Sequence, residues 1–144
     1  MTSVPAASEA AAAASEQKGA PRARNTVQRA LVLEAVRSLH NHPTSADVYE
    51  AVREKHPNIS RATVYRNLSV LAERGEVLHI PVAGGADRYD FRCDCHYHAI
   101  CDGCGAVYDV EMPPADLISQ VRDDHGFNLR GFDIIFRGLC PDCA

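Results

Sequence analysis

Apolar residues recur with a helical period in the first half of the chain. From position 26 to 39 they stand every fourth residue, at Val27, Leu31, Ala35 and Leu39, with Val32 and Val36 beside them. This spacing predicts a helix with one buried face.

Two shorter helices are predicted next, each opened by an N-cap residue. Thr44, with Asp47 three positions later, begins a helix that ends before Pro57. Ser60 begins the other, which ends at Gly75. The side chains expected to face the core are Val48, Ala51 and Val52 in the first, and Val64, Leu68, Leu71 and Ala72 in the second.

The pattern then changes to that of strands. Residues 77–82 and 88–91 are predicted as two strands around Gly84-Gly85. Three short helices followed by a hairpin are typical of a winged helix-turn-helix domain, here expected over residues 22–91. The Ala/Ser/Glu stretch of residues 1–21 has little to pack and is predicted as a disordered tail.

The second half, residues 92–144, predicts a β-β-α-β module. Its expected elements are strands at 97–101 and 106–110, a helix at 115–124 with Leu117, Ile118 and Val121 inward, and a strand at 127–136. About fifty residues bury only a small core, so such a module needs a staple. The predicted fold class is α+β: a winged helix followed by a small α/β dimerisation domain.

Composition narrows the class of protein. The 144 residues are 46% hydrophobic and 24% charged, and contain no Trp. No apolar run approaches the ~18 residues of a membrane helix, and the first twenty residues lack the features of a signal peptide. We therefore expect a soluble cytoplasmic protein with no membrane partner, whose six cysteines are not a disulfide framework.

The net charge of −4 is unevenly distributed. Residues 21–90 carry ten Lys/Arg against eight Asp/Glu, whereas residues 91–144 carry four against nine. A mildly basic half joined to an acidic half suggests two modules, the first able to approach a polyanion. By itself this asymmetry is weak support for nucleic-acid binding.

The third predicted helix has the features of a DNA-contacting helix. Its outward face carries Arg61, Ala62, Tyr65, Arg66 and Ser69. The residues predicted to bind DNA are Arg61, Ala62, Thr63, Tyr65 and Arg66. A helix N-terminus with arginines suits phosphate, and a tyrosine can contact a thymine methyl group or a phosphate. The alternative is an ordinary solvated face. Because one such domain reads few base pairs, a homodimer on a pseudo-palindromic double-stranded operator is expected.

Four cysteines have the spacing of a structural zinc site. Cys101 and Cys104 form one Cys-x-x-Cys pair, and Cys140 and Cys143 form the other. Four thiolates make a closed tetrahedral zinc site, with no open position for a substrate. A thiol redox switch formed by the same residues is the alternative.

A second group of residues predicts a regulatory metal site. His96 and His98 are two apart in a strand and so share one face, while Asp109 lies on the expected partner strand. Asp90 lies where the two modules join, and His42 is a weaker fifth candidate on spacing alone. Nitrogen and oxygen ligands in this number favour Fe(II) or Mn(II) over a closed zinc site.

These motifs together resemble the ferric-uptake-regulator (Fur) superfamily. The resemblance rests on Thr63-Val64-Tyr65-Arg66-Asn67-Leu68, Arg88-Tyr89-Asp90-Phe91, His96-Tyr97-His98 and the two Cys-x-x-Cys pairs, and covers residues 22 to 143. The resemblance implies a winged helix, an α/β dimerisation domain and metal-dependent repression of transcription.

Aspartates at positions 90 and 109, and His42-Pro43-Thr44, resemble the peroxide-sensing branch of this family. That likeness implies Fe(II) or Mn(II) held by His42, Asp90, His96, His98 and Asp109. In the iron form, peroxide would oxidise a ligand imidazole, that of His42 or His96, so that metal and then operator are lost.

Cys93 and Cys95, directly before His96, depart from the family pattern. They are either reduced thiols or an additional metal- or oxidant-sensitive feature, and sulfur near the site would favour a zinc-responsive regulator. An iron- or zinc-responsive uptake regulator is the alternative within the family. A thiol oxidoreductase or metallohydrolase is a remote alternative, since the chain has no His-Glu-x-x-His motif and no thioredoxin-like context.

Overall fold

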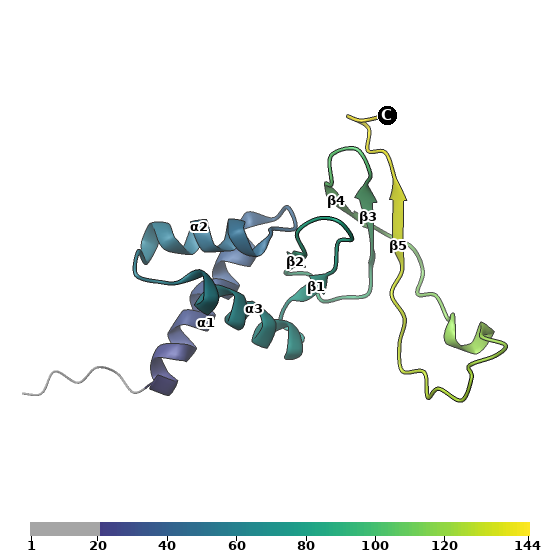
Figure 1. The fold of residues 1–144 in the computed structure, drawn as a ribbon, viewed down its shortest axis with the longest axis horizontal. Helices are drawn as coiled ribbons and strands as arrows, with labels where there is room; N and C mark the ends of the chain where they lie inside the picture. The colour runs from purple at the N-terminus through teal and green to yellow at the C-terminus, as the bar shows by residue number, and fades with distance from the viewer. Residues whose placement is uncertain (1–20) are drawn as a thin grey trace, which may run out of the picture.

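The computed structural model describes residues 21–144. The tail predicted for residues 1–21 lies outside this range except for its last residue, Pro21, which instead begins helix α1 (Pro21–Leu39). Figure 1 shows a helical half and a three-stranded sheet, with the β1–β2 hairpin between them.

Helix α1 begins five residues before the predicted start and buries a different set of side chains. Val32, Ala35 and Val36 are buried, whereas Val27 is 60% exposed. The hydrophobic core includes α1 only from Leu31 onward, so the first two turns lie outside it. The helical spacing is confirmed, but Val27 does not join the core.

Local capping defines the next two helices as predicted. Helix α2 (Ser45–Lys55) opens with a reciprocal capping box: the Thr44 hydroxyl accepts the N–H of Asp47 at 3.1 Å, and the Asp47 carboxylate accepts the N–H of Thr44 at 2.9 Å. Helix α3 (Arg61–Glu73) opens where the Ser60 hydroxyl accepts the N–H of Thr63. Both N-cap predictions are confirmed.

The three helices and the hairpin share one core. Strands β1 (Leu78–Ile80) and β2 (Arg88–Asp90) pair antiparallel. Val48, Leu68 and Leu71 are fully or almost fully buried, and Tyr89 of β2 joins them. The winged-helix arrangement follows from this shared core.

The C-terminal sheet contains β3 (Tyr97–Cys101), β4 (Val107–Val110) and β5 (Ile135–Gly138), in the order β4-β3-β5. β4 is antiparallel to β3, and β5 is parallel to it. Its apolar cluster is small, and includes Ile80 of the wing beside Ile100 and Val107. The wing thus packs directly against the sheet.

Two predicted C-terminal elements were wrong. Instead of a helix at 115–124 there is one 3-10 turn at Ile118–Gln120, and Leu117 and Val121 are exposed. A helix this short is marginal without a surface to pack against, and Asp123 and Asp124 at its end oppose the helix dipole.

The last strand begins at Ile135 rather than at 127. Ile135 pairs with His98, one residue after the start of β3, so earlier residues have no neighbouring strand in the single chain. Residues 111–134, here called the arm, leave the sheet and return to β5 (Figure 1).

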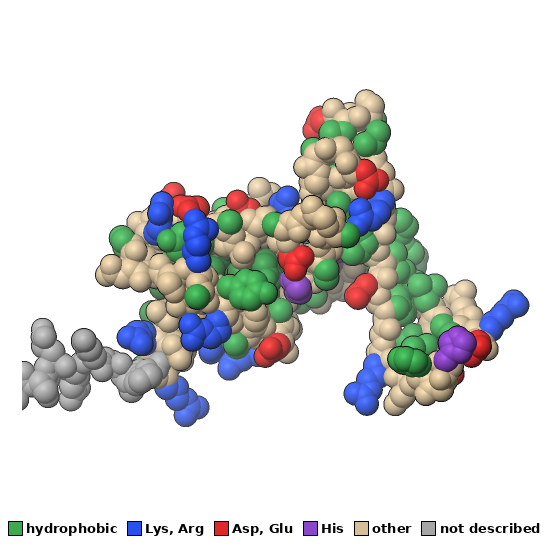
Figure 2. Space-filling model, viewed as in Figure 1, with side chains coloured by type: hydrophobic (Ala, Val, Ile, Leu, Met, Phe, Trp, Pro, Cys, Tyr) green, Lys and Arg blue, Asp and Glu red, His purple; other side chains and the backbone are tan. Residues whose placement is uncertain are grey.

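The arm, β5 and the residue directly after β5 expose many apolar side chains. Those at least 37% exposed are Met112, Leu117, Val121, Phe127, Leu129, Phe132, Phe136 and Leu139. Figure 2 shows hydrophobic side chains along this side of the sheet. Contiguous apolar surface of this kind marks an interaction surface.

Candidate metal centres and DNA-facing helix

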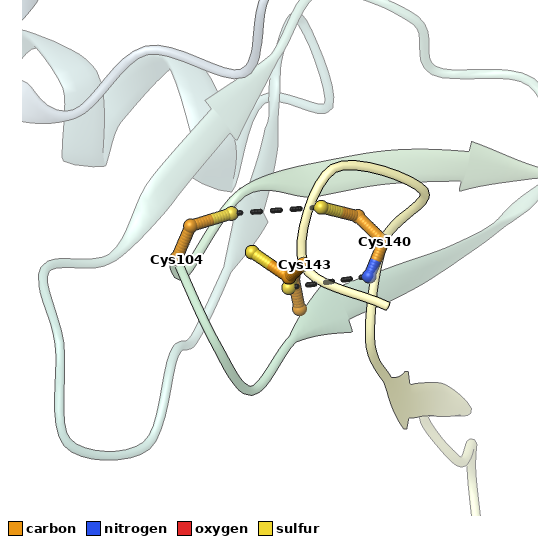
Figure 3. A group of neighbouring side chains, drawn as sticks. Cys104, Cys140 and Cys143 are labelled. Carbon is orange, nitrogen blue, oxygen red and sulfur yellow. Dashed lines mark hydrogen bonds between the residues drawn. The ribbon is translucent and has the colours of Figure 1, made fainter.

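The four cysteines of the two Cys-x-x-Cys pairs come together at one end of the sheet. Cys101 ends β3, Cys104 lies in the turn before β4, and Cys140 and Cys143 lie in the turn after β5. The four sulfur atoms all lie within 4.8 Å of one another. Figure 3 shows the sulfurs of Cys104, Cys140 and Cys143 pointing toward one another.

The spacing of the sulfurs suits tetrahedral zinc. Sulfurs bonded to zinc at about 2.3 Å in a tetrahedron are about 3.8 Å apart. The Sγ atoms of Cys104 and Cys140 are separated by 3.8 Å. At Gly103 a Cβ would lie 3.0 Å from both Cβ and Sγ of Cys143, so the turn needs glycine at this position.

The electrostatics of the cluster also call for a cation. Hydrogen bonds to the Cys101 sulfur lower its pKa to about 6; the largest contribution comes from the backbone N–H of Cys140, and smaller ones come from the Cys101–Cys104 turn. Contact with Cys140, Cys101 and Cys104 raises the pKa of Cys143 to about 12. Four crowded sulfurs cannot all ionise alone, whereas a divalent cation deprotonates them together. The donor set therefore fits zinc.

The second cluster draws on both halves of the molecule. His42 comes from the turn between α1 and α2, Asp90 from the end of β2, and Asp109 from β4. His96 immediately precedes β3, and His98 lies within it. The structure brings His42, Asp90, His98 and Asp109 together with their donor atoms within 4.8 Å of one another, including His42, which spacing alone supported weakly. His96 lies beside this group and contacts Asp90 and His98.

The donor atoms of this cluster face a common centre. Asp90 Oδ2 lies 2.9 Å from His96 Nε2, 3.2 Å from His98 Nε2 and 3.3 Å from His42 Nε2. Asp109 Oδ1 lies 2.7 Å from His42 Nε2 and 3.4 Å from His96 Nε2. Donors bonded at about 2.1 Å to one metal ion lie about 3 Å apart when at right angles.

Charge and burial at this centre favour a cation. Asp90, His96 and His98 are buried, and Asp109 is partly exposed. Burial would raise the pKa of Asp90, but hydrogen bonds from His42, His98 and the N–H of Arg92 hold it well below its usual range. The Asp90 carboxylate in turn raises the pKa of His42. Three imidazoles and two carboxylates fit Fe(II) or Mn(II).

The backbone around His42 is held in an unusual conformation. Its φ is +54°, in the left-handed region that favours glycine. Nη1 of Arg88 donates to the His42 carbonyl at 3.2 Å, and the N–H of Tyr89 donates to the Pro43 carbonyl at 2.9 Å. Hydrogen bonds from strand β2 therefore hold the turn that carries His42 in place against the C-terminal sheet.

Hydrogen bonding outside the cluster differs between the histidines. His96 Nδ1 lies 2.9 Å from the Asp94 carbonyl, and this contact orients the ring so that Nε2 faces Asp90 and His98. His42 Nδ1 is buried and has no partner among residues 21–144. The position of the His42 ring therefore depends on what its Nε2 atom binds.

The predicted DNA-binding residues lie in the first two turns of α3. Tyr65 is 59% exposed, and Arg61 stacks over the Tyr49 ring at 4.3 Å. Ala62 and Arg66 are exposed, whereas Thr63 is half-buried and its hydroxyl contacts that of Ser60. Their role in DNA binding stays a prediction.

A basic hollow beside α3 was not predicted. A cavity of about 150 Å³ between α1 and α3 is lined by Arg24, Arg29 and Arg66, together with Thr63 and other polar residues. Nε of Arg29 is buried without a partner among the described residues. The arginines near the start of α1 could have indicated this hollow. They were not considered because the predicted tail ends just before them, at residue 21.

Cys93 and Cys95 are exposed on the loop before β3. Neither belongs to the two groups of metal-ligating side chains found within residues 21–144. Burial raises the pKa of the Cys93 thiol, which donates to the carbonyl of Phe91. The geometry thus favours the reduced-thiol alternative for Cys93.

A winged helix, a sheet with a four-thiolate cluster and a second cluster joining the two define a metal-binding transcription regulator. The chain belongs to the ferric uptake regulator family, whose sequence model matches residues 21–137. The family prediction is confirmed.

Similar proteins include named peroxide regulators. The peroxide-responsive repressor PerR of Staphylococcus saprophyticus is 37% identical over 121 residues, which are 83% of this chain and 82% of the relative. The peroxide operon regulator of Bacillus subtilis strain 168 is 38% identical over 122 residues, 84% of each chain. Among solved structures, a Campylobacter jejuni peroxide stress regulator aligns with a TM-score of 0.68 at 29% identity, over 85% of this chain and 93% of that one.

Within residues 21–144, no helix is both long and apolar enough to cross a membrane.

Proposed function

We propose that this chain is a metal-dependent repressor that binds DNA and responds to hydrogen peroxide. The observation that carries the proposal is the convergence of His42, His98 and two aspartates on one centre, with residues drawn from both halves of the molecule. The imidazole of His96 lies beside them, 2.9 Å from Asp90 Oδ2. The named peroxide regulators among its relatives support the same function. Cys101, Cys104, Cys140 and Cys143 would hold structural zinc.

The regulatory site would comprise His42, Asp90, His96, His98 and Asp109, with Fe(II) or Mn(II) as the ion. Bound Fe(II) supplies the electron that reduces peroxide and so generates an oxidant beside the ligand imidazoles. His42 connects the helical half to this centre, while the other four residues come from the wing and the sheet. Oxidation of the His42 or His96 ring would make its nitrogen a poorer metal ligand, so that the metal is lost. Without the metal, the helical half is no longer held in the arrangement that fits DNA.

DNA binding is assigned to Arg61, Ala62, Thr63, Tyr65 and Arg66 of α3, with Arg24 and Arg29 as added phosphate contacts. The basic hollow between α1 and α3 supports that addition. The exposed apolar side chains of the arm and β5 support a homodimer, which would bind a pseudo-palindromic operator. Such a protein acts in the cytoplasm by binding and is consumed by oxidation, so it is not a turnover enzyme.

The test compares protein loaded anaerobically with Fe(II) and protein loaded with Mn(II). Each receives about one equivalent of peroxide, followed by operator binding and peptide mass analysis. Gain of one oxygen on His42 or His96, with DNA release in the iron form alone, is expected.

Release governed by metal removal, without histidine oxidation, would overturn the peroxide assignment in favour of an iron- or zinc-responsive regulator. Oxidation confined to Cys93 or Cys95 would instead make those thiols the sensor. His56, exposed at the end of α2, serves as an internal control for nonspecific histidine oxidation.

A further inference from the structure

Arg92 donates a hydrogen bond to each of the two carboxylates of the regulatory cluster, on the side away from the imidazoles. Its backbone N–H donates to Asp90 Oδ1 at 2.9 Å, and its Nη1 donates to Asp109 Oδ2 at 3.1 Å. The other oxygen of each carboxylate, Asp90 Oδ2 and Asp109 Oδ1, faces the imidazoles. Each aspartate is thus held with one oxygen toward the cluster and one toward Arg92.

The Arg92 guanidinium is itself fixed by two further acids. Nε and Nη2 donate to the two carboxylate oxygens of Asp94, at 3.0 Å and 2.5 Å, and Nη1 also donates to Glu111 at 2.7 Å. The Asp94 carbonyl orients the ring of His96. Arg92 therefore contacts two of the candidate ligands directly and a third through Asp94.

A carboxylate can bind a metal through one oxygen or two, and the choice decides how many positions remain open. Five donors, each giving one atom, leave one position on an ion that takes six ligands. If Asp109 turned to give both oxygens, it would occupy that position. A hydrogen bond from Arg92 to the outer oxygen opposes that rotation.

We propose that Arg92 is a positioning residue that keeps Asp109 a one-oxygen ligand and so leaves one coordination position accessible to water and peroxide. This inference rests on the proposed function, since it concerns the same five residues. The backbone N–H of Arg92 does the same for Asp90 and survives any substitution of the side chain, so Asp109 is the carboxylate that a variant frees.

Metal affinity alone is a poor test of this role. Removing the guanidinium removes a positive charge near the cation site, which strengthens metal binding, but it also removes an orienting bond, which weakens it. Asp94 and Glu111 offset much of the charge on Arg92. The number of water molecules bound to the metal is independent of this balance.

The experiment measures water proton relaxation by Mn(II) in the full chain, with zinc supplied first to fill the thiolate cluster. The wild-type protein is expected to show one exchangeable water per bound Mn(II), and Arg92→Met none. Arg92→Lys retains a donor for Asp109 and should recover the water. Glu111→Gln neutralises another partner of the same Nη1 atom and should leave the number of bound waters unchanged.

Retention of the water in Arg92→Met at full manganese occupancy would overturn the inference, as would complete loss of Mn(II) binding in that variant. Should Arg92→Met fail to fold, judged by zinc content and circular dichroism, Arg92→Ala is measured against the same prediction. Failure of the wild-type chain to bind Mn(II) at all would count against the proposed function instead, so the two failures are distinguishable.

Discussion

The two metal-ligating clusters are built from different parts of the chain. The four cysteines lie in two turns at one end of a single sheet, beside β3 and β5. The five His and Asp residues come from a helical turn, the wing and two strands of the sheet. A metal bound in the first cluster would stabilise one module, whereas a metal bound in the second would also favour one arrangement of the two modules.

The hydrogen bonds around the two clusters also differ, being local for the thiolates and between modules for the His/Asp cluster. The sulfur of Cys101 accepts the N–H groups of Gly103 and Cys140, both from the turns that carry the cysteines themselves. His42 is instead held by Arg88 of the wing, and its Nδ1 is unpartnered among the described residues. The thiolate cluster is thus locally supported, while the His/Asp cluster depends on contacts between modules.

The largest expected effect comes from breaking the thiolate cluster. Cys140→Ser should unfold or monomerise the C-terminal module, because structural zinc contributes apparent binding free energies of about 10–16 kcal/mol in small zinc domains. Zinc content and sedimentation velocity measure this. Cys95→Ser, at an exposed cysteine outside both clusters, is the matched control. A stable zinc-free dimer of Cys140→Ser would contradict the structural role.

A smaller effect is expected when the second cluster loses its donor from the helical half. His42→Ala should weaken Mn(II) binding at least about tenfold and abolish metal-dependent operator binding. Zinc content and thermal unfolding should change little. His79→Ala serves as the control, since His79 is partly exposed on the wing, where it pairs with Asp87. Equal losses in the two variants would argue against a ligand role for His42.

Lengthening one carboxylate should separate metal binding from peroxide sensitivity. Asp109→Glu keeps a carboxylate donor but shifts it by one methylene, so Mn(II) should still bind while peroxide acts more slowly on the iron form. The measurement is the rate of histidine oxidation against Mn(II) affinity. Unchanged oxidation kinetics would count against the importance of an aspartate at this position.

The smallest expected effect concerns the link between the two clusters. Arg88 donates to the His42 carbonyl and, at 3.4 Å, to the carbonyl of Gly105 next to Cys104. Arg88→Met should cost about 1–3 kcal/mol of stability, because two part-buried carbonyls lose a charged donor. Chemical denaturation measures this, and Mn(II) affinity should fall while zinc is retained. Arg74→Met, at the end of α3, is an exposed control.

Features that depend on near neighbours in the chain were predicted well. The caps at Thr44 and Ser60, the strand at 97–101 and the convergence of the His96 and His98 rings all follow from spacings of two to four residues. The cysteine pairs are local in the same way, because each Cys-x-x-Cys turn brings two sulfurs together by itself. Backbone hydrogen bonding and side-chain periodicity act over these distances.

Features that depend on distant surfaces were predicted poorly. The helix expected at 115–124 has no surface to pack against in the single chain, and residues 127–134 have no neighbouring strand. Val27 shares the helical spacing of Leu31 and Ala35 but lies outside the core and is exposed. Apolar periodicity shows which face can be buried, but not whether something covers it.

The amino-acid sequence by itself determined the three helices of the first half, the hairpin after them, the two cysteine pairs and the family to which the chain belongs. Only the tertiary structure decided that His42 lies 2.7 Å from Asp109, 67 positions away, and that Arg92 holds the outer oxygens of both aspartates. These contacts form because the wing packs on both the helical core and the sheet. Such long-range packing sums many small apolar contacts, and no short motif records it.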